Sequence, residues 1–315
     1  MLAGLVLLLV VVSQTDVGAE AVTSLWSRLS LARILAAFSV MTAGFAFLAL
    51  RWRSLLPGDN RHIGIGGLTS ILLVGTLLNY ALPGPVGELA AAAMASRRYG
   101  VAGEVALAAG LHARFVGLGV AGSVALLLLV VAEMPVAPEY FPWIATATVA
   151  IAAGVIVLTL LSSRPALLAS LSTTVVAPFS LLAPLHRSML RFAEALGMVG
   201  RVGLRRYALA ALWAFCGHGC VIGGILIAAS GLGAEPAASG LAFTYTVATA
   251  GAVVLYAFPG SQVGWDGMFC ALLVTTTGVS TPDALAMTLV VRIQQLLVVC
   301  LGALVLILSP RAEKK

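Results

Sequence analysis

Two carboxylates and two arginines interrupt stretches of sequence that are otherwise almost entirely apolar. One pair begins in the segment NYALPGPVGELAAAAMASRRYG (residues 79–100), and the other lies in residues 256–292. A charged side chain in hydrocarbon costs between ~2.5 and more than 10 kcal/mol, depending on how the cost is measured. Charges kept at such a cost indicate a polar site, and its candidate substrate-binding residues are Asn79, Glu88, Arg114, Asp266 and Arg292.

A structural role is the alternative for each of these residues. Glu88–Arg114 and Asp266–Arg292 could be ion pairs that hold short helices in place without touching a substrate. Asn79 could cap a broken helix, because its side-chain oxygen can accept a hydrogen bond from a backbone N–H.

The two candidate pairs belong to segments that resemble each other. YALPGPVGE followed by YGVAGEVALAAGLHAR (within 80–114) is echoed by YAFPGSQVGWD followed by TGVSTPDALAMTLVVR (within 256–292). Proline ends a helix because it lacks the backbone N–H and its ring clashes with the preceding turn. We therefore expect a broken helix at the start of each segment, with helix-breaking residues Pro83, Gly84, Gly87, Pro259, Gly260 and Gly264.

The composition is that of a protein embedded in a membrane. Of 315 residues, 61% are hydrophobic and 10% are charged, and the mean hydropathy is +1.07, whereas soluble domains carry about 25% charged residues. The long, unbroken apolar runs favour helices over the alternating strands of a β-barrel. The net charge of +6 comes largely from arginines between these runs, which indicates topology and anionic lipid rather than nucleic acid.

We therefore expect an all-α polytopic fold with about eight full spans, each near the roughly 20 apolar residues that cross a bilayer. Residues 18–33 are interpreted as an interfacial helix. Residues 165–190 are interpreted as an interfacial or re-entrant helix, because prolines interrupt them. Two short or re-entrant pieces, 86–96 and 267–279, must cross most of the membrane for the spans to alternate. The full spans are expected at 1–18, 32–50, 63–82, 101–131, 143–161, 207–229, 239–258 and 284–308.

The arginines orient these spans, because cytoplasmic loops carry an excess of Lys and Arg. The segment 51–62, the connector 162–206 and the C-terminus are basic and are placed in the cytoplasm. The loops 132–140 and 230–238 hold carboxylates but no Lys or Arg, and are placed outside.

With this topology, the first broken helix runs outward and the second runs inward. Repeat unit one (about 63–131) and repeat unit two (about 239–308) are then inverted relative to each other, which is the usual plan of secondary transporters. At a rise of ~1.5 Å per residue, Arg114 would lie roughly 20 Å and Arg292 roughly 12 Å inside their spans.

The same motifs resemble the flippase-like membrane family of the lysylphosphatidylglycerol synthase transmembrane region, also described as UPF0104-type. The resemblance covers nearly the whole chain and implies a single transmembrane domain over residues 1–315 in the bacterial inner membrane. It implies translocation of a lipid or lipid-linked head group between leaflets. It is carried by Arg51-Trp52, Leu55-Leu56, LNYALPGPVGE (78–88), the Gly–Ala–Arg pattern of 100–114 and the PG..VG.D pattern that continues to Arg292.

Three departures from the family pattern bear on the substrate more than on the fold. Ala91 stands where an arginine is frequent, Gly117 stands in place of an acid, and Asp266 comes earlier than the usual glutamate. No cytosolic aminoacyl-transferase domain follows the spans, so the chain is not expected to charge a lipid by the route of the bifunctional members.

Three classes of function fit these features. The first is a flippase for an anionic, phosphate-bearing lipid, a lipid-linked glycan or an aminoacylated lipid. The second is an intramembrane lipid-modifying enzyme that uses Glu88 and Asp266 as an acid–base dyad. The third is a non-catalytic accessory subunit of a lipid or glycolipid pathway. A homo-oligomer is compatible with each of these.

No catalytic residue, metal or cofactor is assigned. In CGHGC (216–220), a helix places Cys216 and Cys220 on one face and His218 on another, which leaves too few ligands for zinc. His112 lies on another face of its helix from Arg114 and is interpreted as a core or interface histidine.

The topology is tested by cysteine labelling in a variant whose four native cysteines are replaced. Cysteines introduced at Glu139 and Arg201 should react with a membrane-impermeant reagent from opposite sides, because these positions lie in an acidic and a basic loop. Permeabilised cells, in which both sites react, supply the control. Labelling of both from one side would contradict the inverted repeat as well.

Overall fold

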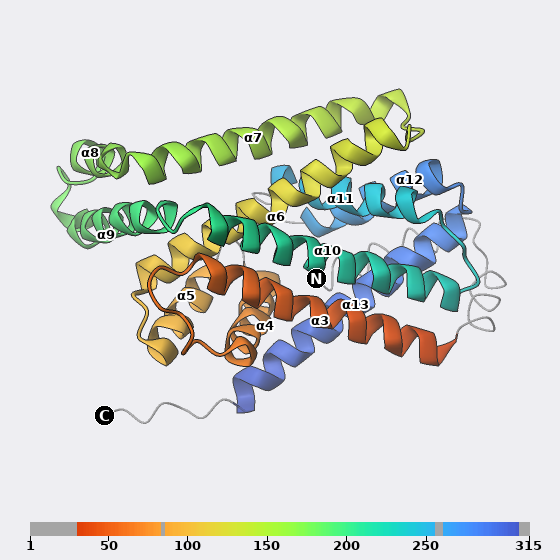
Figure 1. The fold of residues 1–315 in the computed structure, drawn as a ribbon, viewed down its shortest axis with the longest axis horizontal. Helices are drawn as coiled ribbons and strands as arrows, with labels where there is room; N and C mark the ends of the chain where they lie inside the picture. The colour runs from red at the N-terminus through yellow and green to blue at the C-terminus, as the bar shows by residue number, and fades with distance from the viewer. Residues whose placement is uncertain (1–29, 83–85, 256–260, 309–315) are drawn as a thin grey trace. The chain divides into compact units, whose positions relative to one another are not determined.

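The structure is a computed structural model that describes residues 30–82, 86–255 and 261–308. All regular secondary structure in these ranges is helical, as Figure 1 shows. The predicted first span (1–18) and most of the interfacial helix 18–33 lie outside the described residues. The helices are α3 (Leu31–Leu55), α4 (Ile65–Ala81), α5 (Val86–Tyr99), α6 (Gly103–Val131), η1 (Pro138–Tyr140), α7 (Phe141–Ser163), α8 (Pro165–Val175), η2 (Ser180–Leu182), α9 (Ala183–Gly200), α10 (Leu204–Gly231), α11 (Ala238–Leu255), α12 (Ser261–Thr277) and α13 (Thr281–Leu308).

Five of the described helices are long and apolar enough to cross a membrane, namely α3, α6, α7 together with η1, α10 and α13. Each coincides with a span expected from the sequence, so the chain is a multi-pass membrane protein. At 17 and 18 residues, α4 and α11 occupy the expected spans 63–82 and 239–258 but are not among these five. The count of eight spans therefore stays a prediction.

The two helix breaks lie where the sequence predicts them. The chain leaves α4 at Ala81 and enters α5 at Val86, and it leaves α11 at Leu255 and enters α12 at Ser261. Gly87 and Gly264 lie in the first turns of the new helices. The other helix-breaking candidates, Pro83, Gly84, Pro259 and Gly260, lie outside the described residues.

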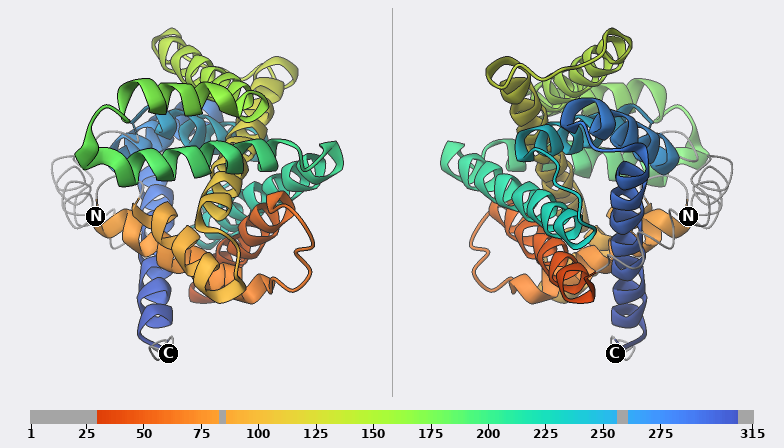
Figure 2. Two further views of the ribbon diagram at one scale, coloured as in Figure 1. Left: turned by 90° about the vertical axis from the view of Figure 1, so that its left-hand side faces the viewer. Right: turned by 90° about the vertical axis from the view of Figure 1, so that its right-hand side faces the viewer.

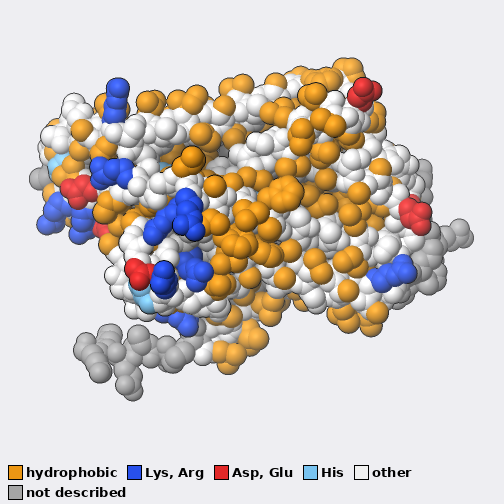
Figure 3. All heavy atoms as spheres, viewed as in Figure 1, with side chains coloured by type: hydrophobic (Ala, Val, Ile, Leu, Met, Phe, Trp, Pro, Cys, Tyr) orange, Lys and Arg blue, Asp and Glu red, His pale blue; other side chains and the backbone are white. Residues whose placement is uncertain are grey.

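The segment 165–190 forms parts of two helices, α8 and α9, which pack side by side (Figure 2). Pro165 and Pro184 lie in the first turns of α8 and α9, where the missing N–H of proline has no intrahelical partner to lose. The Ser172 hydroxyl lies 2.8 Å from His186 Nδ1 and joins the two helices. Figure 3 shows Lys and Arg side chains gathered on the side of the view where α8 and α9 lie, and hydrophobic side chains among other atoms and a few charges over the rest of it.

The chain divides into two compact units. Unit 1 contains residues 1–45, 118–151 and 215–301, and unit 2 contains residues 46–117, 152–214 and 302–315. Each of the five long helices contributes residues to both units, whereas α11 and α12 belong to unit 1 and α4, α5, α8 and α9 belong to unit 2. The two candidate ion pairs therefore belong to different units.

Unit 2 packs its broken helix closely, with small residues at the contact. A Cβ at Gly87 would overlap the carbonyl oxygen of Gly75 and the side chain of Asn79. Ala91 and Ala92 continue the buried face of α5. The absence of side-chain bulk therefore lets α4 and α5 approach each other backbone to backbone.

Unit 1 has a core of large apolar side chains around α11, α12 and α13. Phe243, Phe269 and Met287 are fully buried there, and Trp265 stacks on Phe269 with ring centroids 4.8 Å apart. The Thr244 and Thr276 hydroxyls lie 2.8 Å apart and join α11 to α12.

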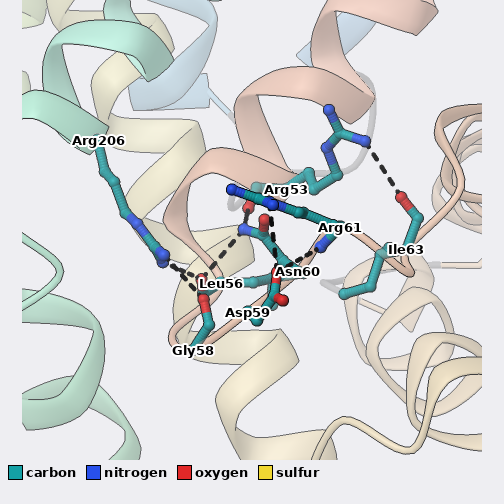
Figure 4. A network of polar contacts seen from close by, with 8 residues as sticks. All are labelled: Arg53, Leu56, Gly58, Asp59, Asn60, Arg61, Ile63 and Arg206. Atoms are coloured by element: carbon teal, nitrogen blue, oxygen red, sulfur yellow. Dashed lines mark hydrogen bonds and ion pairs between the residues drawn. The ribbon is translucent and has the colours of Figure 1, made fainter.

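Arginine side chains hold the loop between α3 and α4 in unit 2 (Figure 4). Arg206 donates to the carbonyls of Leu56 and Gly58, at 2.7 and 2.8 Å. Arg53 donates to the carbonyl of Ile63 at 3.3 Å. These bonds satisfy carbonyls of the loop itself, which have no partner within a helix.

The close contact between α4 and α5 is tested by Gly87→Ala. The added methyl group overlaps backbone, so we expect a loss of about 1–3 kcal/mol in stability, measured as a lower thermal unfolding temperature in detergent. Gly66→Ala in α4 is the control, because a Cβ there meets nothing within 4 Å. Equal unfolding temperatures for the two variants would contradict the proposed packing.

Candidate functional site

In unit 2, the predicted pairing of Glu88 with Arg114 is confirmed. Glu88 lies in the first turn of α5, and its Oε1 accepts a hydrogen bond from Arg114 Nη1 of α6. The Glu88 and Arg114 side chains are 30% and 34% exposed. Glu88 Oε2 is buried and makes no hydrogen bond to a described residue, so this carboxylate has acceptor capacity to spare.

Asn79 caps the helix that carries Glu88. Its Oδ1 accepts a 2.7 Å hydrogen bond from the backbone N–H of Gly87, which is one of the open donors at the start of α5. The capping alternative for Asn79 is therefore confirmed, and its contact with a substrate stays a prediction. The same bond explains why Gly87 has no side chain, since a Cβ would overlap Asn79.

In unit 1, the predicted pairing of Asp266 with Arg292 is also confirmed. Arg292 Nη2 of α13 contacts Asp266 Oδ2 of α12, and the side chains are 4% and 6% exposed. Arg292 Nη1 also donates to Gln295 Oε1 at 2.8 Å. This pair is thus buried far more completely than the pair in unit 2.

The two pairs occupy equivalent positions in their units. Glu88 and Asp266 differ by 178 positions, and so do Arg114 and Arg292. Each arginine is the twelfth residue of its helix, about 17 Å from the start at ~1.5 Å per residue. The local repeat is therefore present in the structure, and the inversion of one unit relative to the other stays a prediction.

The turn before each arginine follows the same register. Gly100 and Gly278 have φ values of 69° and 70°, which glycine adopts without steric cost. Each donates its N–H to the carbonyl four residues earlier, at 2.9 and 3.1 Å. These matched helix ends set the position at which each long helix begins.

The last span was expected to begin at about residue 284, and its helix begins three residues earlier. α13 begins at Thr281, because the Ser280 Oγ caps the helix by accepting a hydrogen bond from the backbone N–H of Asp283 at 3.3 Å. The same hydroxyl donates to Asp283 Oδ2 at 2.6 Å. Arg292 is consequently deeper in its helix than the predicted 12 Å. The segment STPD carried this signal in the sequence.

Arg51 is a candidate residue that the sequence analysis assigned to the basic loop 51–62. Its guanidinium lies against Gly117 of α6, where a Cβ would come within 2.9 Å of Arg51 Cζ. The adjacent Trp52 donates its indole N–H to the carbonyl of Ala106 at 3.0 Å, which fixes α3 against α6. No sequence signal marked this contact, because Arg51 stands at the start of the basic segment 51–62.

His112 is a buried residue with both ring nitrogens engaged. Nδ1 lies 2.9 Å from the carbonyl oxygen of Ala108, and Nε2 lies 3.0 Å from Ser162 Oγ. His218 lies 3.2 Å from the Tyr245 hydroxyl, and Cys216 and Cys220 are free thiols. Among the described residues, no three His, Cys, Asp or Glu side chains gather as a metal-ligand set.

Comparison with known proteins identifies one family. The family described as "Lysylphosphatidylglycerol synthase TM region" matches residues 1–302. No curated protein and no solved structure matches the chain.

The difference in burial between the two pairs predicts a difference in the cost of breaking them. Asp266→Asn leaves Arg292 buried without its counter-charge, a change that costs about 3–5 kcal/mol in buried pairs. Glu88→Gln should cost less, because that pair is one-third exposed. Thermal unfolding in detergent measures both.

Glu139→Gln, in the acidic loop, is the control for removing a carboxylate away from any pair. A stability loss for Glu88→Gln equal to or larger than that for Asp266→Asn would contradict the assignment of the buried pair to unit 1.

Proposed function

The chain belongs to the lysylphosphatidylglycerol synthase transmembrane-region family, and from this premise we propose that it moves a phosphate-bearing lipid or lipid-linked head group across the bacterial inner membrane. The observation that carries the proposal is the presence of one carboxylate–arginine pair at the same position of each unit. Two such pairs supply polar sites at which a head group can bind, although hydrocarbon alone would exclude it.

The arginines suit a phosphate group. Their planar guanidinium donates two parallel hydrogen bonds to phosphate oxygens, which a lysine ammonium cannot do in the same geometry. When no lipid is bound, the carboxylate at each site neutralises the charge of its paired arginine. A phosphate would compete with Glu88 or Asp266 for the same guanidinium, so binding exchanges one ion pair for another.

The broken helices support transport over catalysis. Inverted repeats with broken helices are typical of secondary transporters, and α4–α5 and α11–α12 are such helices. Each carboxylate that an acid–base dyad would require contacts an arginine instead. We therefore propose a non-enzymatic transporter with a cytoplasmic C-terminus.

The proposal is tested in proteoliposomes that contain a fluorescent phosphatidylglycerol, with an impermeant quencher added outside. Arg114→Lys and Arg292→Lys keep the charge but lose the planar donor pair, so each should slow flipping about tenfold or more while the protein still folds. Arg201→Lys, at an exposed position in the basic connector, is the matched control.

The double variant Glu88→Gln with Arg114→Gln removes one pair without leaving a lone charge. Flipping at the wild-type rate by this folded variant would show that the pair is structural. Conversion of the lipid to a new product, detected by mass spectrometry, would instead support the enzyme. A cationic head group would make the Arg→Lys variants nearly silent and the carboxylates essential.

A further inference from the structure

We propose that Arg51 and Arg114 together form an anion site in unit 2 that binds the phosphodiester of a lipid head group, and that Gly117 makes room for it. This inference rests on the proposed function and refines it, because it assigns phosphate binding to one of the two pairs. It adds Arg51, on α3, to a site otherwise built from α5 and α6.

The Arg51 side chain points toward α6. Arg53 and Arg206 donate to carbonyls of the loop between α3 and α4 (Figure 4). Arg51 instead places its guanidinium on Gly117, the fifteenth residue of α6 and about 20 Å from the start of that helix. An arginine near a helix end ordinarily extends its charge toward the membrane surface.

Gly117 lies three residues after Arg114 on α6. Residues three apart on a helix are neighbours on one face, with Cβ positions about 5–6 Å apart. The guanidinium of Arg51 therefore lies beside the turn that carries Arg114. Two cations brought to one helix face favour an anion that can accept from both.

Glu88 is the carboxylate that a phosphodiester would meet at Arg114. Of the other carboxylates in the described part of unit 2, Asp59 lies in the loop that follows α3, Glu104 pairs with Arg191 at the start of α6, and Glu194 is exposed on α9. Glu88 is thus the carboxylate among these described residues that contacts Arg114. A phosphodiester that binds Arg114 would therefore compete with Glu88 for the guanidinium.

In unit 1, a glutamine stands at the position equivalent to Gly117. Gln295 is 178 positions after Gly117, and it accepts a hydrogen bond from Arg292. A neutral amide from the same helix thus occupies, in unit 1, the place that Gly117 leaves to Arg51 in unit 2. The phosphate should therefore bind more tightly in unit 2 than in unit 1.

The test measures binding to the full-length chain in an uncharged maltoside detergent, separately from transport. Short-chain phosphatidylglycerol should bind the wild type, and Arg51→Gln should weaken binding about tenfold or more, the expected effect of losing charge-assisted hydrogen bonds. Gly117→Ala should weaken it as well, because the methyl group displaces Arg51 without changing any charge. Gly119→Ala is the matched control on the same helix, since a Cβ there meets nothing within 4 Å.

Three ligands separate the possible sources of the anion. Tighter binding of phosphatidylglycerol than of inorganic phosphate supports the lipid, and the reverse order overturns the lipid assignment. Diacylglycerol, which lacks phosphate, should show no dependence on Arg51. Wild-type affinity in Arg51→Gln and Gly117→Ala, or no binding of phosphatidylglycerol to the wild type, overturns the proposal.

A measurement on the wild-type protein covers the case of variants that fail to fold. Phosphatidylglycerol should protect Arg51 and Arg114 from modification by phenylglyoxal, as mapped by mass spectrometry, while Arg201 stays reactive. Unprotected Arg51 would overturn the site. Binding without flipping in proteoliposomes would instead refute the transport function and leave the site intact.

Discussion

The cost of an uncompensated charge in hydrocarbon governs the arrangement of both units. A carboxylate near the start of a short helix can be kept in the membrane only if a cation reaches it from a neighbouring helix. In each unit that cation comes from the following long helix, 26 residues later in the sequence. The helix break, the glycine turn and the helix start all serve to bring these two charges together.

Much of this architecture could be predicted from the sequence, because apolar runs and helix breakers act locally. The short helices, both breaks and both ion pairs follow from prolines, glycines and isolated charges. The role of Arg51 could not be predicted, since an arginine close to a basic loop has the pattern of a topology signal. Arg51 lies against Gly117, which is distant in sequence. A glycine in a sequence does not indicate which side chain packs against it.

The two units share a local plan and differ in how they treat their charges. The Asp266–Arg292 pair is almost fully buried, and a glutamine from the same helix supports it. The Glu88–Arg114 pair is one-third exposed, and Arg51 lies against Gly117, three residues after Arg114. The same local plan therefore contains one charge pair that is enclosed by its unit and one that is one-third exposed.

The order of the charges along the chain also constrains biosynthesis. Glu88 leaves the ribosome 26 residues ahead of Arg114, an interval of about 1–5 s at roughly 5–20 residues per second. During that interval the carboxylate has no counter-ion, so α5 cannot settle in the bilayer by itself. We therefore expect each short helix to stay with the insertion machinery until the following long helix emerges, so that the two enter the lipid as one helical hairpin.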